Sequence, residues 1–104
     1  MKKYSCEDKI HYLFFKNLAN KTKIDIVTEL RKSPKSVGEL SKKTGIEQSK
    51  LSHALKSLKT CSIVMVKQDG KKRVYSLNKE TIVPILKIID KHRCKYCKEK
   101  IKNA

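Results

Sequence analysis

Two short helical patterns separated by a single glycine turn constrain the fold of this chain more than any other feature. The first pattern begins at Ser36, because Glu39 three residues later completes a capping box, in which each side chain bonds the other residue's backbone amide. It ends at Thr44-Gly45, since glycine readily adopts the left-handed conformation that follows a helix. A second helix is predicted over 47–59. Its apolar residues share one face: Leu51, Ala54, Leu55 and Leu58. Two helices joined this tightly are typical of a helix-turn-helix.

The next segment changes from a helical period to a strand pattern. Residues 63–68 are rich in β-branched side chains, and a second apolar run over 74–77 follows the dipeptide Asp69-Gly70. Asp-Gly between two such runs predicts a hairpin, with both residues at the centre of a type I′ turn that needs two positive φ angles. A helix-turn-helix followed directly by a hairpin is a winged helix, and we place the wing at about 62–77.

Further helices flank this winged unit. A first helix is predicted over about 6–19 and a last one over about 81–98, while Asn20 caps another helix that ends before Pro34. Both terminal helices carry apolar stripes, namely Ile10, Leu13, Phe14 and Leu18 in the first and Ile82, Ile85, Leu86 and Ile89 in the last. We therefore expect a single α+β domain over 1–104 that is mostly α-helical.

The charge of the chain indicates the class of its partner. It has 26 lysines and arginines against 10 aspartates and glutamates, a formal charge of +16, which favours polyanions and nucleic acid first. No apolar run approaches the roughly 20 residues of a membrane-spanning helix, and the first residues turn acidic where a signal peptide would become apolar. We expect a cytoplasmic protein with no membrane partner. On charge alone, a lysine-rich soluble protein that follows its genome's composition is the alternative.

Two polar surfaces of the predicted winged helix are candidates for binding double-stranded DNA. The face of the 47–59 helix opposite its leucines, with the residues beside it, offers hydrogen-bonding groups that can pair with base edges or reach phosphates: Gln48, Ser49, Lys50, Ser52, His53 and Lys56. Cations crowd the hairpin turn and would repel one another unless a polyanion lay nearby: Lys67, Lys71, Lys72 and Arg73. The alternatives are an ordinary solvated helix face and a hairpin edge that lysines protect from aggregation.

With these elements in place, the sequence resembles the ArsR/SmtB family of winged-helix repressors over roughly 13–89. Residues 18–27 (LANKTKIDIV) are similar to the family's opening LADPTRLRIL, and Val-Gly-Glu-Leu follows at 37–40. Residues 48–58 (QSKLSHALKSL) look like the family's recognition helix, and Ile63-Val64 and the wing end at 74–77 follow in the expected order.

The resemblance implies a homodimer that represses transcription. In the family, the first and last helices pair across the two-fold axis, and the two recognition helices enter successive major grooves of a near-palindromic operator. The apolar stripes of the terminal helices agree with this, because so small a winged domain has little core to cover them. Family members leave the operator when an effector binds, often a metal ion.

This chain departs from the metal sites of the family. One family site needs cysteines just after a Glu-Leu pair, but Ser-Lys-Lys follows Glu39-Leu40 here. Asp90-Lys91-His92 matches the first half of the other site, on the last helix, but the second half, a later His-x-x-Glu or His-x-x-His, is missing. The complete family sites are therefore not expected in this protein.

The cysteines offer a different candidate site. Cys94 and Cys97 directly follow His92, and two thiolates with an imidazole suit zinc or another thiophilic ion; Cys6 completes the set if the terminal helices meet at the dimer interface. A redox or sulfur-reactive thiol switch, favoured by the cations Arg93, Lys95 and Lys98, and ordinary free thiols remain open. Cys61 is expected to fill a small space in the core.

No nucleophile–base–acid set, phosphate-binding glycine loop or paired carboxylate occurs in the sequence, so we expect no enzymatic activity. The expected function is sequence-specific regulation of transcription. The rival interpretation is a winged-helix nucleic-acid coat or protein-interaction module, with a structural zinc site and no effector response. A coat protein needs cations on its recognition helix, whereas this chain offers mainly amide, hydroxyl and imidazole groups there.

Overall fold

The computed structural model describes residues 6–93 and 95, with the side chains at 6–8 and 10 left outside the description. Its elements, in chain order, are α1 (Cys6–Leu18), α2 (Lys21–Lys32), β1 (Lys35–Ser36), α3 (Val37–Thr44), α4 (Gln48–Thr60), β2 (Val64–Asp69), β3 (Lys72–Leu77) and α5 (Ile82–His92). This is the mostly helical winged helix-turn-helix that the sequence predicts. None of the described helices combines the length and the apolar character needed to cross a membrane.

The helix boundaries follow from local capping chemistry. The predicted capping box is present, with the Glu39 amide bonded to the Ser36 hydroxyl and the Ser36 amide bonded to the Glu39 carboxylate. The bond that the Ser36 amide donates to the Glu39 carboxylate is the main cause that holds the pKa of Glu39 below its usual value. Gly45 ends α3 at φ 74°, in the left-handed region, and the Asn20 side chain accepts a bond from the amide of Lys23 at the start of α2.

The turn of the wing corrects the sequence prediction by one residue. Asp69 pairs with Lys72 as the last pair of the β2–β3 ladder, so the two central residues of the turn are Gly70 and Lys71. Of these two residues, only Gly70 has a positive φ, of 63°. A positive φ at the first central residue alone is the pattern of a type II′ turn, which suits glycine and spares Asp69 a left-handed conformation.

A third strand, β1, was not predicted from the sequence. Its two residues pair antiparallel with β3 and make the strand order β1-β3-β2. Lys35 in β1 is only 6% exposed, and its ammonium donates to the carbonyl oxygens of Glu29 and Ser33 at 2.8 and 3.2 Å. A lysine that bonds carbonyls at the end of α2 also lies favourably toward the negative end of the helix dipole.

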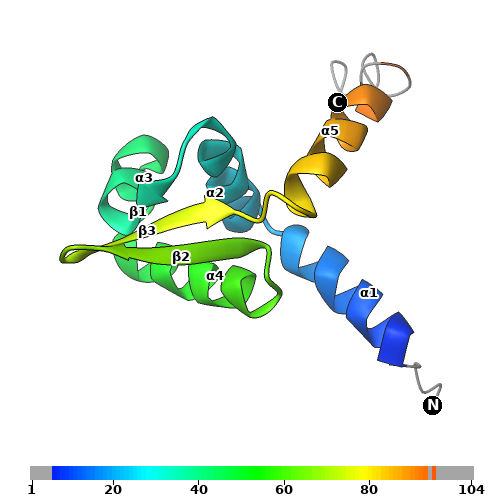
Figure 1. Cartoon of the computed structure of the whole chain (residues 1–104), viewed down its shortest axis with the longest axis horizontal. Helices are drawn as coiled ribbons and strands as arrows, with labels where there is room; N and C mark the ends of the chain where they lie inside the picture. Colours follow the sequence, from blue (N-terminus) through cyan, green and yellow to red (C-terminus); the bar gives the residue numbers. More distant parts are fainter. Residues whose placement is uncertain (1–5, 94, 96–104) are drawn as a thin grey trace.

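The hydrophobic core lies where α2, α3 and α4 meet the sheet. Its fully buried side chains include Ile26, Leu40, Leu51, Leu55, Leu58, Ile63 and Ile82. Figure 1 shows α1 and α5 leaving this body on the side opposite the hairpin turn. Phe14 and Leu18 of α1 and Val83 and Leu86 of α5 pack against the core and are partly buried.

The apolar stripe predicted on the last helix is therefore divided between two environments. Ile82 is buried within its own chain and Leu86 partly so, whereas Ile88 and Ile89 are 66% and 51% exposed. Among the described side chains of α1, the exposed large apolar ones are Tyr12, Leu13 and Phe15. Intrachain packing uses the first part of α5 because this part directly follows β3 and lies against the body.

Two glycines in and after α3 give a matched test of the left-handed helix end. Replacing Gly45 by alanine is expected to lower the free energy of unfolding by about 1–2 kcal/mol, because a β-carbon is strained at positive φ. Replacing Gly38 by alanine, inside α3, is expected to raise it by about 0.5–1 kcal/mol, since the added β-carbon would meet its nearest neighbours at an ordinary 3.9 and 4.0 Å. Urea unfolding of both variants measures the difference, and equal stabilities would contradict this account.

Candidate nucleic-acid interface

Helix α4 carries the candidate base-reading surface. Leu51 and Leu55 are fully buried beneath it, and this fixes the opposite side of the helix toward solvent. The six predicted DNA-contact residues of this segment are all exposed: Gln48, Ser49, Lys50, Ser52, His53 and Lys56. The structure thus brings them together along one helix, in the second position of the helix-turn-helix.

One of these side chains already has a partner within the chain. The Ser49 hydroxyl donates to the Glu47 carboxylate at 3.0 Å. Because the Ser49 hydroxyl proton is used in this bond, the hydroxyl oxygen can only accept a hydrogen bond from a further group. We expect Ser49 to accept hydrogen bonds, and Ser52 and His53 to have the wider choice of contacts.

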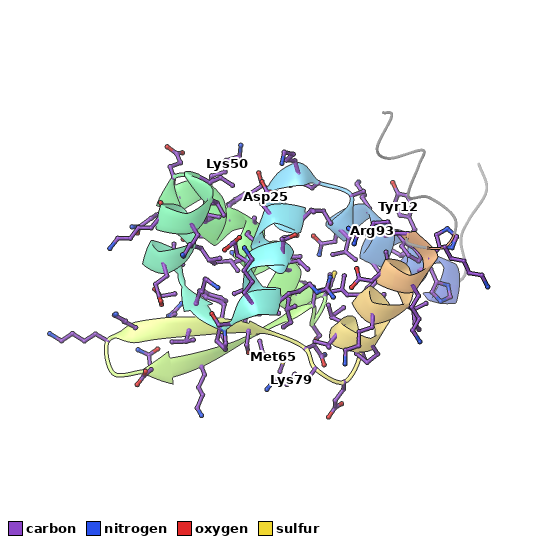
Figure 2. The ribbon with its side chains drawn as sticks, turned by 90° about the horizontal axis from the view of Figure 1, so that it is seen from above. Tyr12, Asp25, Lys50, Met65, Lys79 and Arg93 are labelled. Atoms are coloured by element: carbon purple, nitrogen blue, oxygen red, sulfur yellow. The ribbon has the colours of Figure 1, made fainter. Side chains whose placement is uncertain are left out.

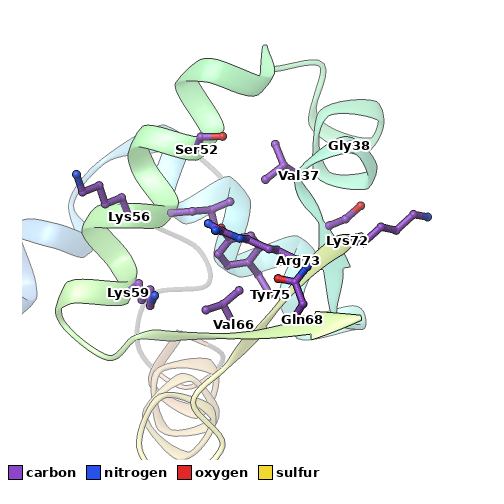
Figure 3. A pocket seen from close by; sticks show the side chains of 12 residues that line it. Val37, Gly38, Ser52, Lys56, Lys59, Val66, Gln68, Lys72, Arg73 and Tyr75 are labelled. Carbon is purple, nitrogen blue, oxygen red and sulfur yellow. The ribbon is translucent and has the colours of Figure 1, made fainter. Parts of the chain in front are cut away.

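The wing and α4 enclose a groove of about 950 Å³. Lys56 and Lys59 line it from α4, while Arg73 and Tyr75 line it from β3. Figure 3 shows Arg73 extending toward α4, whereas the Lys72 amine points outward. Four lysine and arginine side chains in or beside one open groove make a surface of positive potential that suits a phosphate backbone.

The turn of the wing places a further cation beyond this groove. Lys71 is exposed at the turn, and the Gln68 amide braces that turn by donating to the Gly70 carbonyl at 2.8 Å. Three of the four predicted wing cations thus take different positions around the turn, with Lys71 at the tip, Lys72 at the mouth of the groove and Arg73 inside it. The fourth, Lys67, is exposed on β2.

Comparison with known proteins gives the family. A profile of the bacterial regulatory protein, arsR family, matches residues 20–66. The uncharacterized HTH-type transcriptional regulator Rv0081 of Mycobacterium tuberculosis is 37% identical over 79 residues, which cover 75% of this chain and 69% of that protein. The chain belongs to the ArsR family. As a member it is a DNA-binding transcriptional regulator and not an enzyme, as the sequence predicts.

Solved structures of other ArsR-type regulators have the same fold. The crystal structure of Rv0081 aligns with a TM-score of 0.83 at 29% identity, covering 94% of this chain and 99% of that one. The transcriptional repressor BigR of Xylella fastidiosa aligns with a TM-score of 0.67 at 25% identity, covering 89% and 88%. The homodimeric winged helix-turn-helix domain of Mb0332 from Mycobacterium bovis has a TM-score of 0.78 over 92% and 93% of the chains, but at 19% identity it shows the fold alone.

Lys59 and Tyr75 are among the groove residues of this ArsR-family protein that sequence reasoning missed. Lys59 stands three residues after Lys56 and so lies on the same flank of α4, and extending the polar face by one turn would have found it. Tyr75 was assigned only to the strand pattern. Its position in the groove depends on the pairing of β3 with both β1 and β2, which no local pattern reveals.

The predicted cysteine cluster falls mostly beyond the described structure. Cys94 and Cys97 lie outside the described residues, and so does the side chain of Cys6. His92 is the last residue of α5. Within the described part of the chain, no three histidine, cysteine, aspartate or glutamate residues are grouped as metal ligands would be. Cys61 is partly buried and packs against the core, in agreement with its predicted role as a filler.

Asp90, which matches half of a family metal motif, is engaged elsewhere. The Arg31 guanidinium at the end of α2 donates to both Asp90 carboxylate oxygens, at 2.6 and 3.3 Å. This pairing holds the pKa of Asp90 below its usual value. A metal ion at Asp90 would have to displace a bidentate arginine, so the ion pair argues against the family's last-helix site in this regulator.

Proposed function

We propose that this regulator is a sequence-specific repressor that binds double-stranded DNA as a homodimer. In this proposal α4 lies in the major groove and the wing follows the adjacent backbone. The observation that carries it is the combination on α4 of exposed amide, hydroxyl and imidazole groups with a cationic groove along one flank. BigR, which shares the fold at 25% identity, is a transcriptional repressor, and this supports the assignment of repression.

The roles of the contact residues divide according to their chemistry. Gln48, Ser49, Ser52 and His53 carry short or planar polar groups that can distinguish base edges. Lys50 and Lys56, and the wing residues Lys71, Lys72 and Arg73, carry charges that suit phosphates and add affinity for any sequence.

The dimer interface in this proposal is formed by α1 and α5. The exposed apolar side chains at 12, 13 and 15 of α1 and at 88 and 89 of α5 lie on the two helices that leave the body on the side opposite the hairpin turn. Such side chains gain stability when a second copy covers them. The Mb0332 domain, which has the same fold, is homodimeric. Two α4 helices must then be spaced by about one DNA turn, roughly 34 Å.

The base-reading and phosphate-binding roles predict different results on two kinds of DNA. An operator is first selected from a random duplex pool, and each variant is then measured on the operator and on random duplex at matched salt. Replacing Ser52 or His53 by alanine is expected to cost about 1–3 kcal/mol on the operator and little on random duplex. Replacing Lys72 or Arg73 by glutamine is expected to weaken both and to reduce the salt dependence.

Equal losses on both DNAs for all four variants would contradict base reading by α4. Failure of the pool to yield any preferred sequence would favour the rival interpretation, a nucleic-acid coat or protein-interaction module, because such a module binds through charge alone.

The dimer proposal is tested by charging its apolar surface. Ile89→Glu is expected to dissociate the homodimer, because a carboxylate would be buried at the interface without a partner. Ile24→Glu is the matched control, since Ile24 is also exposed, at 44%, but lies on α2. Sedimentation velocity at micromolar concentration should give a dimer for the parent and the control and a monomer for Ile89→Glu. A monomeric parent would overturn the proposal.

We further propose that Cys94 and Cys97, with help from His92 or Cys6, bind a thiophilic ion, zinc first. The donor chemistry supports this proposal, because thiolates and imidazole are preferred zinc ligands. The pair follows α5, the helix assigned to dimerisation, so a ligand there can alter the spacing of the two α4 helices. A ligand shifts that equilibrium only by its different affinity for the two dimer geometries.

The metal proposal is tested on protein purified without added metal, by elemental analysis and thiol titration. Replacing both Cys94 and Cys97 by serine is expected to abolish zinc binding, whereas Cys61→Ala is expected to retain it. If zinc changes the parent's DNA affinity, the site is a sensor; if zinc raises only the melting temperature, the site is structural. A double variant that binds zinc and DNA like the parent would contradict both roles. Oxidised and reduced parent protein compared on the operator would then test a thiol switch.

A further inference from the structure

A second cleft lies on the flank of α4 that faces away from the wing. Its volume is about 860 Å³, and its walls are the start of α2 and the outer side of α4. Lys23 lines it from α2, and Lys50, His53 and Lys56 line it from α4. The one carboxylate in its lining is Glu47, which accepts the hydrogen bond of Ser49. Three lysines against one carboxylate leave the cleft cationic.

The lysine from α2 is held in place by a network that crosses three helices. The Lys23 ammonium donates to the Ser57 hydroxyl at 3.1 Å. That hydroxyl donates to the side-chain oxygen of Asn17 at 2.8 Å, and the Asn17 amide returns a bond to the Ser57 carbonyl at 2.9 Å. Asn17 is only 7% exposed. Lys23 is therefore a positioned cation, and its ammonium has two further N–H groups for an acceptor.

The position of this cleft matches the geometry of a helix in the major groove. A helix with its side chains is about 10–12 Å across, and the major groove is about 12 Å wide. A helix that fills the groove therefore has a phosphate backbone along each flank. The wing groove, with Lys59 and Arg73, lies on one flank of α4. The α2–α4 cleft lies on the other, with Lys23 and Lys50 in its lining.

We propose that the α2–α4 cleft is a second phosphate-binding surface, which holds the DNA strand opposite to the one contacted by the wing. Lys23 and Lys50 are its contact residues, and Lys56 lies between the two surfaces because it lines both. This inference rests on the proposed function, since it requires α4 to lie in the major groove. It adds a DNA-contacting role for α2, whose first turn contains no acidic residue.

The salt dependence of DNA binding measures how many phosphates the protein contacts. The probe is a fluorescent random-sequence duplex of about three helical turns, measured by anisotropy between about 50 and 200 mM salt. Each phosphate contact contributes about −0.9 to the slope of log affinity against log salt. Lys23→Gln and Lys50→Gln should therefore each reduce the slope by about 0.9 per protomer, or about 1.8 per homodimer. Glutamine at position 23 can still donate to Ser57, so the fold should be kept, and thermal melting checks this.

Lys79→Gln is the matched control, because it removes the same charge from an exposed position in the loop after β3. Figure 2 places Lys79 on the side of the molecule opposite Lys50. The slope of log affinity against log salt for Lys79→Gln should equal that of the parent. A slope change in the control as large as that of Lys23→Gln would mean that net charge alone is measured, and it would overturn the cleft proposal.

The wing variant Arg73→Gln separates failure of this inference from failure of the proposed function. If Arg73→Gln lowers the slope while Lys23→Gln and Lys50→Gln leave it unchanged, the cleft proposal is wrong and the proposed function stands. If none of the three lowers it, both are wrong. Strand assignment is tested on the selected operator with uncharged methylphosphonates in one strand or the other of each half-site, placed symmetrically because the two-fold axis of the homodimer exchanges the strands between half-sites. Neutralising one strand should remove the effect of Lys23→Gln, and neutralising the other the effect of Arg73→Gln; the same strand for both would overturn the assignment.

Discussion

The burial of one side of α4 is the constraint on which the rest of this structure depends. Leu51, Leu55 and Leu58 are fully enclosed by α2, α3 and the sheet. Because a helix cannot rotate without exposing such a stripe, its polar side is fixed toward solvent along its whole length. The polar side of α4 therefore lies between the wing groove and the α2–α4 cleft and forms one wall of each.

Specific polar contacts tie the terminal helices to this body. Asn17 of α1 exchanges two hydrogen bonds with Ser57 of α4, and Asp90 of α5 accepts two from Arg31 of α2. The Asn17–Ser57 contact is partly buried and the Arg31–Asp90 contact is exposed, so solvent screens the second more strongly. Through them the orientation of the proposed dimerisation helices is linked to that of the helix that carries the DNA-contact residues.

The same contacts narrow the choice of effector sites. A bidentate arginine on Asp90 leaves the last-helix metal motif of the family without its carboxylate, while the thiols follow at positions 94 and 97. If an ion binds this regulator through those thiols, it does so next to α5 but with a different donor set. Such a site could act on the dimer without breaking the Arg31–Asp90 pair.

Sequence alone determined the elements whose signals are local. These elements could be predicted because each depends on residues within one or two helical turns. They are the capping box at Ser36, the left-handed Gly45, the leucine stripe of α4 and the polar residues opposite that stripe. The resemblance to the family added the order of these elements and their function. The exact turn of the wing was misplaced by one residue, because Asp-Gly fits two turn types and only the strand register chooses between them.

Only the tertiary structure decided which residues far apart in the sequence share a surface. Four contacts join elements that are separate in the sequence. They are the pairing of β1 with β3, the capping of α2 by Lys35, the ion pair between Arg31 and Asp90, and the hydrogen bond from Lys23 to Ser57. The division of the α5 stripe into buried Ile82 and exposed Ile89 likewise depends on where the body ends. A periodic pattern states which face of a helix is apolar, but what covers that face is set by the packing of the whole chain.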